Sequence, residues 1–205
     1  MKIWWMSILN LIMASTVVVA CATPPKQSTF LFPTPTSEPV QDPMLKSNGG
    51  GEPRSPDYWL AWNSCAEGNQ SAVAATNGGK EAGWIIMDDL LTDRGMLIGT
   101  LQIETCQQGV SLLQAQNLQG TEMKNDAAYT LASQLLAAQL NLATGSEYCP
   151  ASDKTVSQAQ LLLLELNFDG TQSYLGPPQA NANVENAKKL TEELVSYNNG
   201  TLCIP

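Results

Sequence analysis

Histidine is absent from the whole 205-residue sequence. Its absence removes the side chain most often used for acid or base catalysis near neutral pH, including the usual base of serine and cysteine hydrolases. It also removes imidazole, the commonest metal-binding side chain. Chemistry based on carboxylates remains open. The sequence therefore favours a non-enzymatic protein without a metal or a cofactor.

Basic residues are also scarce, with 10 Lys and Arg against 19 Asp and Glu and a formal net charge of −9. Nucleic-acid binding needs clustered Lys and Arg against the phosphates, so we expect no nucleic-acid partner. The same acidity repels anionic lipid headgroups. Attachment to a membrane therefore has to come from something other than surface charge.

Residues 1–20 have the order of a secretory signal peptide, with a positive charge at Lys2, an apolar run over residues 3–20 and a small residue at the end. The run ends in Val18-Val19-Ala20-Cys21, which resembles the bacterial lipobox. In such precursors the cysteine receives diacylglycerol and the peptidase cuts before it. Acyl chains anchor durably because each buried methylene contributes about 0.8 kcal/mol. We predict that lipidated Cys21 holds the protein on the extracytoplasmic side of a bacterial membrane, in the cell envelope.

Two other interpretations of this segment are open. Residues 3–20 approach the length of an uncleaved transmembrane anchor, and ordinary signal peptidase could cut near Ala20 and release a soluble protein. The cysteine count favours the lipoprotein. Five cysteines are an odd number, and assigning Cys21 to lipid leaves an even number for two disulfides in an oxidising compartment.

Residues 21–56 read as a tether that begins at the lipidated cysteine. The segment is rich in proline, contains Gly49-Gly50-Gly51 and has almost no periodic apolar pattern, so it is predicted to stay unfolded and extended. It is either a spacer that lifts the domain off the membrane or passive filler. Residues 57–205 remain as one domain of common size.

Three helices are predicted in the C-terminal half of this domain, because apolar residues recur there at helical spacing between capping and stop residues. We expect them to pack into a bundle. The spans are 126–143 after an Asn125 or Asp126 cap, about 152–167 after a Ser152 or Asp153 cap, and 184–197 after an Asn183 cap. The stop signals are Gly145, Asp169-Gly170 and Asn198-Asn199-Gly200. The predicted surface ion pairs of the last helix are Lys188 with Glu192 and Lys189 with Glu193.

The N-terminal half is less regular. Alternation near the end of residues 96–104 suggests one short strand, and residues 106–116 read as a brief helix with Val110 and Leu113 inward. Residues 66–83 read as an irregular loop. The predicted fold class is therefore mainly α, a small helical bundle with a minor β element.

Several motifs occur in a characteristic order: Tyr58-Trp59, Trp84, the helix from Asp126, Cys149-Pro150 and Tyr197-Asn198-Asn199-Gly200. This order resembles the TPGYWKNH-type domain of bacterial surface proteins over residues 56–203. The segment after the aromatic pair lacks the Lys and His of the family motif. The resemblance implies an extracellular module without an agreed activity.

The cysteines at 65, 106, 149 and 203 lie far apart, with no CxxC pair, which argues against a zinc site. Four cysteines allow three pairings. We favour Cys149 with Cys203, because antiparallel helices after the first and before the second would bring them to one end. Cys65 would then pair with Cys106, and each bridge is expected to contribute about 2–4 kcal/mol.

Two further groups are candidates for function. The acidic cluster of Asp88, Asp89 and Asp93 could serve glycoside hydrolysis or bind calcium, but it lacks the pattern of a calcium-binding loop and reads as a solvated helix start. Tyr58 and Trp62 are candidates for a contact surface. Two other tryptophans, Trp59 and Trp84, are expected in the core.

Taken together, these features predict a membrane-anchored surface lipoprotein that displays a non-enzymatic module for a cell-surface protein or glycan. The alternatives are an envelope hydrolase that uses carboxylates such as Asp88 or Asp89, and a lipoprotein that captures a small solute. An enzyme of this kind should show a concave pocket with two converging, partly buried acids.

Overall fold

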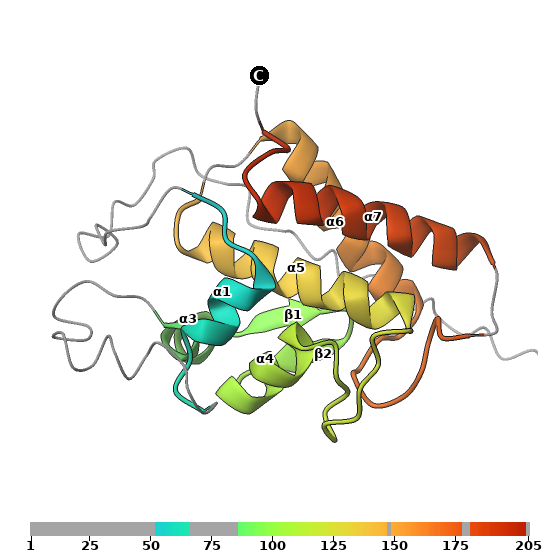
Figure 1. The fold of residues 1–205 in the computed structure, drawn as a ribbon, viewed down its shortest axis with the longest axis horizontal. Helices are drawn as coiled ribbons and strands as arrows, with labels where there is room; N and C mark the ends of the chain where they lie inside the picture. The colour runs from blue at the N-terminus through green and yellow to red at the C-terminus, as the bar shows by residue number, and fades with distance from the viewer. Residues whose placement is uncertain (1–51, 66–85, 147–148, 178–180, 204–205) are drawn as a thin grey trace, which may run out of the picture. The chain divides into compact units, whose positions relative to one another are not determined.

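The computed structural model describes residues 52–65, 86–146, 149–177 and 181–203. They belong to one compact unit, Gln41–Pro205, which is mainly helical with one small two-stranded sheet, as the sequence predicts (Figure 1). The helices are α1 (Pro56–Ala61), α3 (Met87–Arg94), α4 (Cys106–Leu113), α5 (Ala127–Ala143), α6 (Pro150–Glu165) and α7 (Ala182–Asn198), and the strands are β1 (Met96–Ile98) and β2 (Leu101–Ile103).

Helix α5 is the centre of the fold. It contacts α6 and α7 on one side and α4 and β1 on another, and it runs through the middle of the view in Figure 1. Its alanines and leucines are buried almost all round, which is why it needs neighbours on several faces. It begins at Asp126, whose carboxylate accepts a hydrogen bond from the Ala128 N–H at 2.9 Å, which confirms one of the two predicted caps.

The other two predicted helices also form, and α5, α6 and α7 pack on one another as expected. Both start earlier than predicted. Helix α6 begins at Pro150, because proline suits the first turn, where its missing N–H costs no bond, and Ser152 Oγ accepts from the Cys149 N–H. Helix α7 begins after Asn181, whose side chain accepts from the Val184 N–H at 3.1 Å.

The predicted stop of α6 at Asp169-Gly170 is wrong. The helix ends at Glu165, and Asn167 takes a positive φ of 51° while the N–H groups of Asn167 and Phe168 reach back to the carbonyls of Leu164 and Leu163. Asp169 has another role. Hydrogen bonds from the hydroxyls of Thr171 and Tyr174 lower the pKa of its carboxyl group.

One predicted ion pair is also wrong. Lys188 pairs with Glu185 at 2.9 Å, one turn towards the N-terminus, and not with Glu192. Lys189 and Glu193 do approach each other, at 4.0 Å. Lys188, Glu185 and Lys189 are exposed and Glu193 is half-buried, so these surface pairs contribute little to stability.

The predicted single strand at 96–104 is a hairpin. Strands β1 and β2 are antiparallel, with Met96 opposite Ile103, and Gly99 and Thr100 form the turn. Gly99 has a φ of 61°, and a Cβ there would lie 2.8 Å from the Phe168 carbonyl oxygen, so glycine is required. The helix predicted after the strand is α4, and its Val110 and Leu113 are buried as expected.

Two disulfides join the cysteines in the pairing favoured from the sequence. Cys65 is bonded to Cys106, and Cys149 to Cys203, with Cα–Cα distances of 6.0 and 5.8 Å. The second bridge fastens the start of α6 to the turn after α7. The antiparallel arrangement of these two helices is therefore covalently fixed.

Several predictions concern residues outside the described part of the chain. These residues include the signal segment, Cys21 and nearly all of the tether, together with the loop at 66–83 and Trp84. Within the described residues, no helix has the length and apolar character needed to cross a membrane. The contacts of the domain begin upstream of Asp57, since Pro56 is buried and the Arg54 backbone is hydrogen-bonded to α5.

Candidate functional site

A buried hydrogen-bond network lies where the described chain begins. Asn141 of α5 accepts from Trp59 Nε1 at 3.0 Å and from the Arg54 N–H at 2.9 Å, and it donates to the Arg54 carbonyl at 2.8 Å and to Asn198 Oδ1 at 2.9 Å. Asn198 in turn donates to the backbone and side-chain oxygens of Gln134. All four hydrogen-bonding positions of the Asn141 amide are thus used. We call these five residues the Asn141 network.

The Asn141 network joins three segments that lie far apart in the sequence. Trp59 belongs to the aromatic pair Tyr58-Trp59, Asn141 lies near the end of α5, and Asn198 belongs to the Tyr197-Asn198-Asn199-Gly200 motif. Trp59, Asn141 and Asn198 are each at most 2 % exposed. Their shared role is structural, because together they hold the start of the domain onto α5 and α7.

Tyr197, beside Asn198, provides a test of this packing. Its hydroxyl is buried with no hydrogen-bond partner in the described structure, and burial raises its pKa to about 12. Tyr197→Phe is therefore expected to leave the free energy of unfolding unchanged at neutral pH or to raise it by about 1 kcal/mol.

The pKa of Tyr197 is higher in the folded chain than in the unfolded chain. Its ionisation therefore leaves the free energy of unfolding unchanged below about pH 10 and lowers it as the pH rises towards 12. Urea unfolding at neutral and alkaline pH should show a smaller alkaline loss in Tyr197→Phe than in the wild type. Equal losses in the two proteins would contradict this assignment. Tyr129, whose pKa burial also raises, is present in both and serves as an internal reference.

A second buried centre lies at the other end of α5. The Asp126 carboxylate accepts four hydrogen bonds, from the N–H groups of Ala128, Tyr174 and Leu175 and from the Ser173 hydroxyl, at 2.7–3.0 Å. The side chain is 2 % exposed. Its oxygens are therefore engaged in holding the 173–175 segment against the helix.

A surface groove crosses α1, the end of α4 and the edges of α5 and α7. It consists of two adjoining depressions of about 430 and 330 Å³, which share Asp57 and Leu113. We call it the Asp57 groove. The first depression is lined by Asp57, Leu60, Leu113, Gln114, Ala115, Gln116 and Lys124, and the second by Ser55, Pro56, Asp57, Leu113, Ser133, Gln134, Val195 and Asn199.

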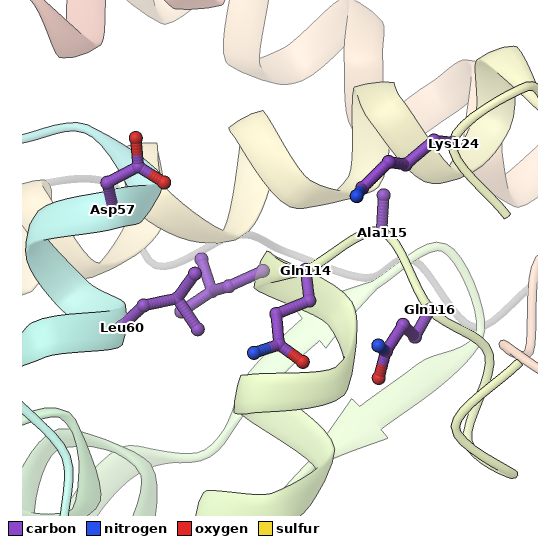
Figure 2. A pocket seen from close by; sticks show the side chains of 7 residues that line it. Asp57, Leu60, Gln114, Ala115, Gln116 and Lys124 are labelled. Atoms are coloured by element: carbon purple, nitrogen blue, oxygen red, sulfur yellow. The ribbon is translucent and has the colours of Figure 1, made fainter. Parts of the chain in front are cut away.

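The groove combines charged and amide side chains with apolar ones. Figure 2 shows Asp57 and Lys124 on opposite sides of the first depression, with Gln114 below them at the end of α4. Leu60 and buried Leu113 supply apolar surface. Gln134 and the Arg54–Ser55 segment connect the groove to the Asn141 network, so the network positions its second half.

The predicted contact residues lie elsewhere. Trp62 is only 6 % exposed, so its prediction as a contact residue is wrong. Tyr58 is half-buried, with its ring edge-on to Trp59 at 5.3 Å and the Arg54 guanidinium 5.1 Å from its centre. Neither Tyr58 nor Trp62 lines the Asp57 groove.

The predicted acidic cluster is spread along α3, with Asp93 near the end of the helix. Asp88 and Asp89 lie in its first turn, and Asp88 accepts from the N–H and the hydroxyl of Ser64 at 2.9 and 2.8 Å. Ligand atoms of Asp88, Cys65 and Cys106 lie within 4.8 Å of one another, but the two sulfurs are joined and are not thiolate ligands. Among the residues lining the described groove, Asp57 is the single carboxylate.

Three residues of the network and the groove are not predicted from the sequence: Asn141, Gln134 and Lys124. Asn141 did carry a signal, since an amide within a helix of leucines and alanines must find a partner when that helix is buried. Its partners lie 57 to 87 residues away, so no local pattern could name them. Lys124 and Gln134 carried no comparable signal.

Comparison of the chain with protein-family models, with curated proteins and with solved structures finds no match. A functional proposal therefore rests on the residues of this chain.

Proposed function

We propose that this protein is a membrane-anchored bacterial surface lipoprotein whose helical domain is a non-enzymatic interaction module. Cys21 carries the lipid, the proline-rich segment after it separates the domain from the membrane, and the Asp57 groove contacts a partner in the cell envelope.

The cysteine pairing is the main observation that supports a lipid anchor at Cys21. Disulfides account for four of the five cysteines, and Cys21 is the one left over. It lies directly after an apolar run and the small residue Ala20, where lipoprotein precursors have their acylated cysteine. Disulfides are typical of exported proteins, in which an unpaired thiol is unusual.

The groove and the network beneath it support the interaction module. The motif residues Trp59, Asn141 and Asn198 are engaged in holding the fold together. The groove above them carries charged and amide side chains beside apolar surface, which is the composition of a contact site rather than of a paired-carboxylate catalyst. The resemblance to surface-protein domains agrees with display outside the cell.

Metabolic labelling with a fatty-acid analogue tests the anchor. The wild type should incorporate the label and remain with the membranes, whereas Cys21→Ser should lose the label and the membrane association, because the acylated sulfur is gone. Cys65→Ala/Cys106→Ala is the matched control, since it removes two other cysteines, which are joined in a disulfide, and should keep the label. Equal labelling of the wild type and Cys21→Ser would refute the lipoprotein.

A further inference from the structure

We propose that the Asp57 groove binds an extended peptide segment of an envelope protein that presents a basic side chain to Asp57. This inference rests on the proposed function, because it names the class of partner that the interaction module takes.

The charges of the Asp57 groove favour a ligand with a basic group. Asp57 is exposed, lines both depressions and therefore lies at the junction where a ligand of either half would meet it. Lys124 stands at one end and already pairs with Glu122 at 3.4 Å, so it is partly neutralised. Acidic residues outnumber basic ones in the whole chain, which adds to the attraction of a cation.

The amides of the groove match a peptide backbone. Within the described structure, the side chains of Gln114, Gln116 and Asn199 form no hydrogen bond with other residues, although they lie along the groove. A carboxamide offers donors and an acceptor together, so it pairs with either the C=O or the N–H of an extended segment. Apolar Leu60, Leu113 and Val195 offer contacts for the intervening side chains.

A glycan fits less well. Sugar rings bind most readily where an aromatic face is open for stacking, and no aromatic residue lines either depression. The aromatic residues nearest along the chain, Tyr58 and Trp59, pack on each other. A peptide is therefore favoured over a glycan.

Fluorescence anisotropy with short synthetic peptides tests the inference on the full chain carrying Cys21→Ser. The probes are Ser/Ala peptides with one central Lys, one central Glu or no charge. The Lys peptide should bind most tightly, and Asp57→Asn should weaken it by about two- to fivefold, as expected for an exposed ion pair, while leaving the neutral peptide unchanged. Asp57→Lys should make the Glu peptide the preferred one.

Glu192→Gln is the matched control. It removes one negative charge from an exposed position of α7 that does not line the groove, and it should leave the Lys-peptide affinity unchanged. If Glu192→Gln weakens binding as much as Asp57→Asn, the preference comes from the overall charge and the inference fails. It also fails if the Lys and Glu peptides bind the wild type equally.

Binding of soluble cell-wall glycan fragments is measured as well, because it distinguishes failure of this inference from failure of the proposed function. Glycan binding that is lost in Gln114→Ala, without binding of the Lys peptide, would overturn the peptide inference and keep the interaction module. Binding of neither probe would overturn both the inference and the groove as the contact surface. The lipid attachment at Cys21 is tested independently, by the labelling experiment.

Discussion

Replacing both Cys149 and Cys203 with alanine is expected to lower the free energy of unfolding by about 4 kcal/mol. The bridge closes a 54-residue separation, and the chain-entropy model gives roughly this value for a loop of that length. The effect should be large because the bridge alone joins the start of α6 covalently to the turn after α7. Guanidinium unfolding of the variant and the wild type measures it.

The other bridge serves as the comparison. Cys65 and Cys106 close a separation of 41 residues, so the same model predicts a similar loss for Cys65→Ala/Cys106→Ala. A Cys149→Ala/Cys203→Ala variant that unfolds at the wild-type denaturant concentration would show that noncovalent packing of α6 on α7 suffices, contrary to this prediction.

Replacing Asn141 with alanine is expected to cost about 3 kcal/mol, because several buried polar groups lose their partner at once. Trp59 Nε1 and Asn198 Oδ1 are enclosed by the core, and the Arg54 N–H and C=O lose the amide that holds them to α5. Urea unfolding measures the total. Asn199→Ala removes the exposed amide that follows Asn198 in the chain, and it should change stability by less than about 0.5 kcal/mol.

A double-mutant cycle isolates one bond of this network. Trp59→Phe removes the indole N–H, so the losses from Trp59→Phe and Asn141→Ala should be less than additive when they are combined. Strict additivity would mean that the bond between Trp59 and Asn141 contributes nothing. A loss below about 1 kcal/mol for Asn141→Ala alone would contradict the role given to the whole network.

The helices were predicted well because apolar spacing, caps and stop residues all lie within the helix itself or next to it in the sequence. The apolar spacing of residues 127–143 and the Asp126 cap are readable within a few turns, as are the glycines that follow helices α5 and α7. The errors arose at ends and turns that tertiary contacts decide. Helix α6 starts at Pro150, although Ser152 and Asp153 look like caps. Gly99 makes a hairpin turn because the Gln160 side chain is hydrogen-bonded to the Gly99 backbone and the Phe168 carbonyl accepts from the N–H of Thr100.

The candidate site was harder to predict for the same physical reason. Trp62 was a candidate for a contact surface, yet it is buried, and nothing in its immediate sequence distinguishes a core tryptophan from a surface one. The Asp57 groove combines residues from α1, α4, α5 and α7 with Lys124. Only the folded chain brings these residues together, whereas the disulfide pairing followed from the predicted direction of two helices.

Covalent anchoring at Cys21 is the central claim, and the mass of the mature N-terminal peptide tests it most directly. Mass spectrometry of the protein purified from bacterial membranes should find a chain that begins at Cys21 and carries diacylglycerol on its sulfur. A chain that retains residues 1–20, or one that begins near Cys21 with no added lipid, would contradict the claim.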